Sequence, residues 1–272
     1  MIKISSTTGK SWVLGTYVTT VFTDLGGKPF DVRIQRHSTT TKEAGTGQRK
    51  LVSTDSSGVY YTIDFKLKVT ALATFINVNC FVTAEGVLPS FSLYTDDGIT
   101  KRGFTTCYVN TCSIEGGQTG ALTANIQVIA IASEDKTLTG TLPTIAPMTK
   151  AAVTTLSIGG TTITKWTKFN FSVNNNVKVL ATGNGVAMTE IWAQQAEYSG
   201  SVTFVKTAAL TYGYAADVAK DLIITLVNNA GSPATATYTF DDVRATSNEY
   251  SVSELDITYE SVAWDGDELA IT

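Results

Sequence analysis

The chain has 272 residues, of which 43% are hydrophobic and only 16% charged, and its formal net charge is −4 at pH 7. This length accommodates two domains of ordinary size, each with its own core. The acidic balance argues against a protein that grips a nucleic-acid backbone, because such binding needs clustered lysine and arginine. Abundant threonine, valine and glycine, together with only 5 prolines, favour an all-β fold over helix or disorder.

The first half of the chain predicts a compact β unit with one short helix. Residues 12–22 are rich in valine, threonine and tyrosine, and a turn at Gly26 and Gly27 joins this strand to an alternating strand over 30–34. Residues 35–57 are polar and predict a mobile arm. The remaining predicted elements are a strand, a short helix and three further strands, at 59–69, 71–77, 91–94, 106–114 and 121–132.

A threonine-rich stretch with prolines divides the chain. Residues 133–150 predict a linker, so the expected domains are residues 1–148 and 149–272. A glycine-centred hairpin over 153–163 opens the second domain. Its last strand, 253–263, is expected to alternate between a core face and a water face, with Leu255, Ile257 and Tyr259 inward and Asp256, Thr258 and Glu260 outward.

Two half-buried strands enclose a long arm in the second half. Phe169, Phe171 and Val173 alternate with polar residues, and a second alternating strand begins at Glu197. Residues 174–196 between them predict a long arm, in which Asn174, Val177, Val179, Ile191 and Trp192 stand out, and the first arm carries Arg36, Lys42, Arg49 and Lys50.

The two halves align when the sequence is shifted against itself by 139 residues (169 minus 30). The shift pairs apolar residues without a gap: Phe30 with Phe169, Val32 with Phe171, Ile34 with Val173, Val52 with Ile191, Ile63 with Val202 and Phe65 with Phe204. With some drift it also relates the helix predicted over 71–77 to residues 208–218. The pattern predicts an internal duplication in which the two arms are equivalent.

No constellation of side chains predicts an enzyme, a metal site or a cofactor. The single histidine, His37, lies in a polar arm without a partner for acid–base chemistry. Cys80, Cys107 and Cys112 lack zinc-binding spacing and are expected to be free thiols, with Cys107 and Cys112 on opposite faces of one strand. Paired aspartates such as Asp96–Asp97 occupy predicted turns, where they cap backbone groups; a calcium site is the alternative.

The second half carries a pattern of strand, asparagine turn, arm and returning strand. Residues 169–176 read FNFSVNNN and residues 197–204 read EYSGSVTF. In order and spacing this pattern resembles the major tail tube proteins of long-tailed bacteriophages and tailed archaeal viruses. The resemblance implies two tandem β-sandwich or open-barrel units, each with a short flanking helix.

The resemblance also implies a structural virion protein whose rings stack into a hollow tail tube, through which DNA passes at ejection. The partners would be further copies of the chain, tape-measure, terminator and baseplate-type tail proteins, and viral DNA that is not bound sequence-specifically. Assembly would take place in the host cytoplasm. With two units per chain, three chains would complete a homotrimeric ring with pseudo-six-fold symmetry, and the basic residues of the first arm would face the next ring. The second arm, residues 174–196, would be largely disordered in the free subunit and ordered by its neighbours in the tube, and the residues named above in the two arms would be the contacts between subunits.

A two-domain β-sandwich adhesin or receptor-binding module is the alternative interpretation, because composition alone fits both. An exported adhesin is expected to carry a signal sequence and disulfides. The sequence shows no apolar signal-peptide core near its start, no membrane-spanning run and an odd number of cysteines, which favours the tube subunit.

Overall fold

The computed structural model describes residues 13–19, 21–44, 51–72, 75–83, 85–117, 120–138, 147–148, 153–180, 190–206, 220–227, 235–252 and 257–272. Strands make up 74% of the structure and helix 2%, which confirms the all-β prediction. The described strands form one antiparallel 15-stranded sheet, which curls around a core, and one separate two-stranded ribbon.

Among the described residues, the first half of the chain contributes seven strands and a short helix. In chain order these are β1 (Val13–Val18), β2 (Val21–Asp24), β3 (Gly27–Ala44), β4 (Leu51–Val69), α1 (Ile76–Asn79), β5 (Phe91–Asp96), β6 (Lys101–Gly117) and β7 (Thr123–Asp135). Neighbours in the sheet follow the order β2-β1-β5-β6-β7-β4-β3. The helix begins later than the predicted span of 71–77, and its counterpart predicted at 208–218 lies outside the described residues.

The second half contributes the remaining strands. They are β8 (Val153–Ile158), β9 (Thr161–Thr162), β10 (Trp166–Asn174), β11 (Lys178–Leu180), β12 (Glu190–Trp192), β13 (Glu197–Val205), β14 (Lys220–Val227), β15 (Thr235–Val252), β16 (Thr258–Gly266) and β17 (Glu268–Ile271). Without the arm ribbon β11–β12 and the final strand β17, the order is β9-β8-β14-β15-β16-β13-β10. The two halves therefore have the same strand order, with β3 corresponding to β10, β4 to β13, β6 to β15 and β7 to β16.

The irregularities of the two halves also correspond. The β6–β7 pairing shifts between Val109 and Thr111, and the β15–β16 pairing shifts between Ala245 and Ser247. The β5–β6 pairing likewise shifts at the position where the β14–β15 pairing does. A β-bulge is a specific one-residue insertion that bends a strand, so matching bulges extend the likeness beyond strand order.

The matched bulges correct the residue equivalence predicted from the sequence. They place Ile126 of β7 at the position of Val262 of β16. Ile126 pairs with Phe65, and Val262 pairs with Val202. Phe65 therefore corresponds to Val202, and not to Phe204 as the uniform shift had it. The slip is an even number of residues, so the inward face of each strand was still assigned correctly.

The core runs through both halves without interruption. Phe169, Phe171 and Val173 of β10 are buried, as their alternation predicted. Phe171 packs against the rings of Tyr238 and Phe240, with ring centroids 4.9 and 5.3 Å apart. One cluster of buried residues joins these aromatic residues to the first-half core, so the halves fold onto each other through a shared apolar interior.

The bulge in β6 reverses one prediction about the cysteines. Cys107 and Cys112 are both buried in the main core, and not on opposite faces, because the extra residue at the bulge shifts the side-chain alternation between them. Cys80 is buried too, and all three are free thiols. Burial raises the pKa of the Cys80 and Cys107 thiols, which keeps them protonated and unreactive at neutral pH.

The phase predicted for the last long strand was wrong. Glu260, Val262 and Trp264 of β16 point inward, and Tyr259 is only half-buried. The apolar pair Val262 and Trp264 sets the phase, since it buries more surface than Ile257 and Tyr259 would. The buried Glu260 carboxylate accepts a hydrogen bond of 2.9 Å from the Asn248 side chain. Leu255 and Asp256 lie outside the described residues.

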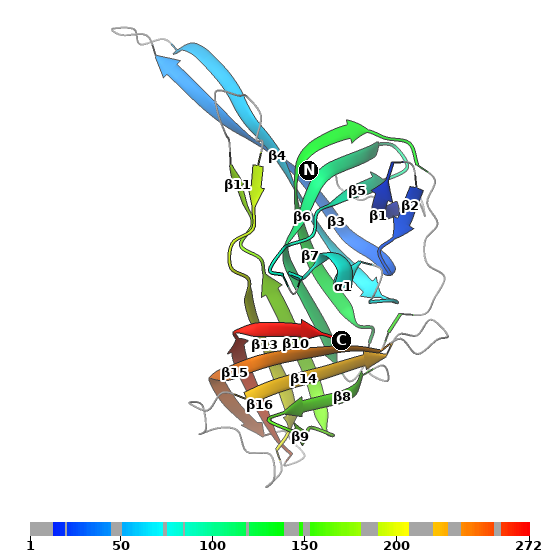
Figure 1. Ribbon diagram of the computed structural model, residues 1–272, viewed down its shortest axis with the longest axis vertical. Coiled ribbons are helices and arrows are strands. Elements are labelled where there is room, and N and C mark those ends of the chain that lie inside the picture. Colours follow the sequence, from blue (N-terminus) through cyan, green and yellow to red (C-terminus); the bar gives the residue numbers. More distant parts are fainter. Residues whose placement is uncertain are drawn as a thin grey trace.

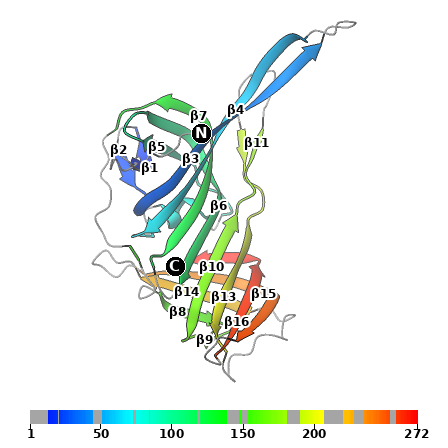
Figure 2. The same cartoon turned by 180° about the vertical axis from the view of Figure 1, so that it is seen from behind.

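The two arms extend toward the same end of the molecule. Figure 1 shows the β3–β4 hairpin leaving the body with β11 beside it, and Figure 2 shows the same arrangement from behind. The polar stretch 35–57, predicted as a mobile arm, instead continues β3 to Ala44 and β4 from Leu51. Its β-branched threonines favour extended backbone, but the sequence there shows no alternation of apolar and polar residues that would predict a strand.

A glycine in β13 makes room for a core tryptophan. A methyl group at Gly200 would lie 2.5 Å from the Trp264 ring and would clash with the Asn170 carbonyl oxygen. We expect Gly200→Ala to destabilise the fold by about 1–3 kcal/mol, as overpacking usually does. Gly266→Ala on the paired strand is the matched control, because its methyl group would meet nothing closer than 3.5 Å. Equal urea midpoints for the two variants would contradict this account.

Candidate assembly surface

The two halves are joined edge to edge inside the chain. The last part of β6 pairs antiparallel with β10, with Ile114 opposite Phe171 and Cys112 opposite Val173. All four side chains are buried. The internal junction is thus a β-sheet edge of the first half completed by the first arm strand of the second half.

Asn175, just beyond the end of β10, stabilises the β6–β10 junction with hydrogen bonds. Its side-chain amide is buried and donates to the carbonyl oxygens of Cys80 (3.0 Å) and Val109 (2.9 Å). Its backbone N–H donates to the Asn110 carbonyl at 2.8 Å, and the Val177 N–H donates to the Asn110 side chain at 2.9 Å. The asparagine turn predicted from the sequence therefore fills the bulge of β6 with hydrogen bonds.

Besides the end strands β2 and β9 and the strand β17, two edges that correspond to the internal junction have no strand partner within the described part of the chain. On one side of the molecule β3 pairs with β4 alone. On the other, residues 247–252 of β15 pair with β16 alone. These are the counterparts of β10 and β6, the two strands that meet in the internal junction. Unpaired sheet edges with free backbone groups are templates for pairing with another chain.

The open edge of β15 carries apolar side chains in water. Tyr250 is 39% exposed and Val252 67% exposed. The Lys206 ammonium lies 3.9 Å from the centroid of the Tyr250 ring, and Glu249 is exposed beside it. The β3 edge presents the exposed side chains Arg33 and Arg36 around the half-buried Ile34. Both edges thus combine apolar residues with charges, which are of both signs on the β15 edge and positive at Arg33 and Arg36 on the β3 edge.

The sheet face opposite the core is polar outside the separate apolar cluster of Leu88, Ile129 and Val177. Hydroxyl and amide groups bond across neighbouring strands: Asn125 to Ser113 at 3.2 Å, Ser172 to Ser199 at 3.0 Å, Ser201 to Asn170 at 3.1 Å and Thr203 to Ser261 at 3.1 Å. The Lys66–Asp31 ion pair of 3.2 Å adds charges of both signs. A shallow hollow of about 430 Å³ lies on this face between β4, β6, β7 and β10.

The predicted contact residues of the second arm are brought together at its base. Val177, Val179 and Ile191 pack beside Leu88 and Ile129 of the first half. Trp192 stays 59% exposed. The Asn174 side chain bonds only to Asn176, at 3.0 and 3.1 Å. The expectation of a largely disordered arm therefore does not hold for its base, which is a ribbon anchored on the first half; residues 181–189 lie outside the described part.

The basic candidates of the first arm are spread along the projecting hairpin. Arg36 lies exposed at its root, next to His37, whose ring stacks on Tyr60 with centroids 4.6 Å apart. Lys42 lies on β3 with its side chain outside the description, and Arg49 and Lys50 lie outside the described residues altogether. The structure places Arg36 close to the open β3 edge.

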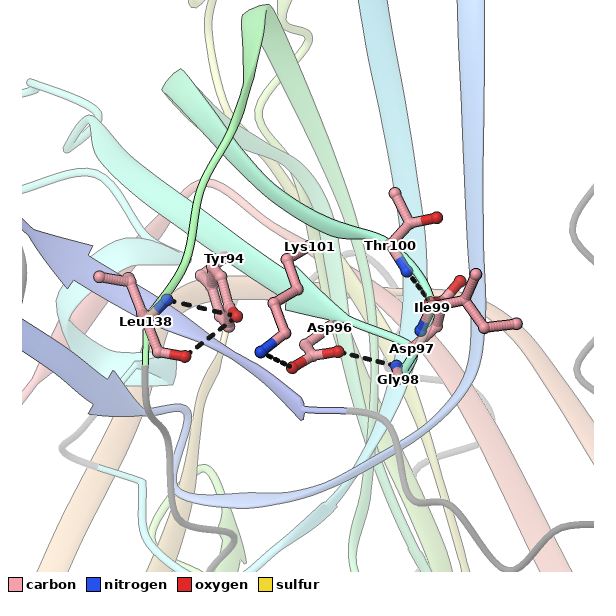
Figure 3. A network of polar contacts seen from close by, with 8 residues as sticks. All are labelled: Tyr94, Asp96, Asp97, Gly98, Ile99, Thr100, Lys101 and Leu138. Atoms are coloured by element: carbon pink, nitrogen blue, oxygen red, sulfur yellow. Dashed lines mark hydrogen bonds and ion pairs between the residues drawn. The ribbon is translucent and has the colours of Figure 1, made fainter.

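The predicted aspartate turn caps backbone groups as expected. Figure 3 shows Asp97 accepting the N–H groups of Ile99 (2.8 Å) and Thr100 (2.6 Å), and Asp96 accepting that of Gly98 (2.7 Å) while lying 3.5 Å from Lys101. Within the described residues, no group of three or more His, Cys, Asp or Glu side chains could hold a metal ion. No helix in that part of the chain is long and apolar enough to cross a membrane.

Comparison with known families agrees with the resemblance seen in the sequence. The family model described as phage tail tube protein matches residues 4–266, nearly the whole chain. The chain belongs to the phage tail tube protein family. No curated protein is significantly similar to it. Membership in this tail tube family makes the chain a structural component of a virion tail.

Sequence reasoning missed the residues that mark the tail tube protein's open edge. Tyr250 and Val252 end an 18-residue strand whose first part is buried against β14 and whose second part is not, so one alternation does not describe it. Asn175 was seen only as part of a turn. The sequence does contain one signal for this edge, the apolar residues Tyr250 and Val252 within a polar stretch, because exposed apolar residues indicate an interface.

Proposed function

We propose that the chain polymerises as stacked rings into the hollow tail tube through which viral DNA is ejected. The observation that carries this proposal is a subunit of the tail tube family with two complementary open sheet edges, on β3 and β15. In a monomer such edges leave backbone hydrogen-bonding groups without a strand partner, whereas in a closed ring each edge pairs with a neighbouring subunit. The function needs neither catalysis nor a cofactor.

We further propose that residues 1–148 and 149–272 are duplicated tail-tube units and that three chains form a pseudo-six-fold ring. The shared strand order and the matching bulges support the duplication. Six equivalent sheets joined edge to edge would close the ring, with three junctions inside chains and three between them. Fusing two units makes half of the junctions intramolecular, which lowers the entropic cost of assembly.

The polar sheet face suits the wall of the conduit. Its hydroxyl and amide groups already bond to one another, and its charges have both signs. DNA binds where clustered positive charge displaces its counterions, so a face of this composition lets DNA slide. Tape-measure, terminator and baseplate-type tail proteins would be the partners at the ends of the tube, and assembly would occur in the host cytoplasm.

Cryo-electron microscopy of the purified protein at high concentration tests the proposal. We expect stacked rings of three chains, each chain spanning two adjacent sheets, with the polar face lining the lumen. Rings of six whole chains would contradict the three-chain ring inferred from the duplication, but they would still support the tube. A protein that stays monomeric across salt and temperature would contradict the tube itself and favour the adhesin alternative.

A further inference from the structure

We propose that β3 of one subunit pairs antiparallel with the β15 edge of the next, in the register of the internal β6–β10 junction. This inference rests on the proposed tube function and specifies the contact that closes the ring. The partner is a second copy of the chain, because the structure already contains one solved example of this junction between corresponding strands.

The register follows from the equivalence of the two halves. Ile114 corresponds to Tyr250, because each lies at the same distance past the matching bulge. Phe171 pairs with Gly200, and Ile34 pairs with Ile63, the counterpart of Gly200. Since Phe171 lies opposite Ile114, Ile34 of one subunit lies opposite Tyr250 of the next. The neighbouring pairs are Arg33 with Ser251, Gln35 with Glu249, Arg36 with Asn248 and His37 with Ser247.

The side chains of this register fit one another. Ile34, half-buried within its own subunit, would cover the exposed Tyr250 ring on the core side of the sheet. Arg33 and Glu249 fall on the opposite, polar face as diagonal neighbours, within reach of an ion pair. The apolar pair extends the core across the subunit boundary, and the charges oppose a slip of one residue, which would expose every inward side chain.

The junction between subunits lacks the Asn175 hydrogen bonds that stabilise the internal junction. The counterpart of Asn175 on β3 is Ser38, three residues beyond Gln35 just as Asn175 is three beyond Ser172. A serine side chain is too short to reach two carbonyl groups of a bulge as the Asn175 amide does. The internal junction is therefore permanent, whereas the junction between subunits depends on strand pairing, Tyr250 burial and exposed charges, which salt screens.

Disulfide trapping tests the register. In Gln35→Cys/Glu249→Cys the new thiols face each other only between subunits, and the native cysteines are buried and do not compete. Under mild oxidation of assembled tubes we expect a covalent species of three chains on a non-reducing gel. The control Gln35→Cys/Ser251→Cys shifts one thiol by two residues along the same face, beyond disulfide reach, and is expected to stay unlinked.

The outcomes separate this inference from the proposed function. If the control pair of cysteines forms a disulfide in assembled tubes, or if neither pair does, the proposed register is wrong but the tube function stands. If the wild-type chain forms no tubes, the proposed function fails and the junction with it. Should the first pair fail to assemble, Arg33→Cys/Ser251→Cys repeats the test at the adjacent paired position, and absence of linkage there overturns the register.

Discussion

Tyr250→Asp is expected to give a folded subunit that no longer forms tubes. Tyr250 is 39% exposed in the single chain, so a carboxylate there is hydrated before assembly and adds little strain. In the proposed junction it would be buried against Ile34, with the Lys206 ammonium beside it and the Glu260 carboxylate on the paired strand opposite. Burying a charge that is only partly compensated costs several kcal/mol, and each 1.4 kcal/mol is tenfold in association, so we expect assembly to weaken by more than about 100-fold.

The measurement compares sedimentation and negative-stain images at matched concentrations, with thermal unfolding as the test of folding. Val18→Asp is the control, because Val18 is 77% exposed at the end of β1 and lines a hollow with residues of α1, β5 and β6 and none of β3 or β15. It carries the same change of chemistry and is expected to assemble normally. If Tyr250→Asp forms normal tubes, or if both variants lose their tubes, the result contradicts a specific role of the β15 edge in the contact between subunits.

The sequence predicted those strands that have one buried face and one exposed face. β10 and β13 alternate strictly, and Phe169, Phe171, Val202 and Phe204 lie where the alternation placed them. Strands without a single alternation could not be assigned in this way. The outer part of the β3–β4 hairpin has no alternating pattern in sequence, so it looked like a mobile arm although it forms a continuous ladder.

A bulge explains the wrong prediction about the cysteines. A bulge adds one residue to one strand, which inverts the alternation beyond it without any change in composition. This is why Cys107 and Cys112 face the same core although their spacing assigned them opposite faces. The uniform shift between the halves fails for a different reason: a slip of two residues keeps the alternation of apolar residues, so the pattern alone does not exclude it. Pairing partners, which decide the equivalence, are long-range contacts that no local pattern contains.

The sequence predicted only part of the candidate assembly surface. The sequence indicated that two arms exist and that Val177, Val179 and Ile191 are their apolar points, and these residues do meet at the base of the second arm. It did not indicate that they contact the same chain. Which edges stay open depends on the order of strands in space, and this order brings β6 against β10 while leaving one edge of β3 and one edge of the last part of β15 without a partner among the described strands.

Asn175→Ala is expected to lower the stability of the subunit by about 2–5 kcal/mol, the largest effect of a single polar side chain in the junction. The substitution removes the donor from two carbonyl groups, those of Cys80 and Val109, that Asn175 satisfies in a buried site. Each buried carbonyl left without a partner costs about 1–3 kcal/mol. For a chain of this size the midpoint of thermal unfolding should fall by about 5–15 °C.

Two further variants distinguish the hydrogen bonds from packing. Asn174→Ala is the matched control, since the Asn174 side chain bonds only to Asn176 in the same turn, and its cost should stay below about 1 kcal/mol. Asn175→Asp keeps the shape but turns an oxygen toward two carbonyl oxygens, so it should be worse than alanine at neutral pH and recover partly in acid, where the carboxyl group becomes a donor. If alanine at 175 costs no more than alanine at 174, the amide does not hold the two halves together, and the strand pairing of β6 with β10 must suffice.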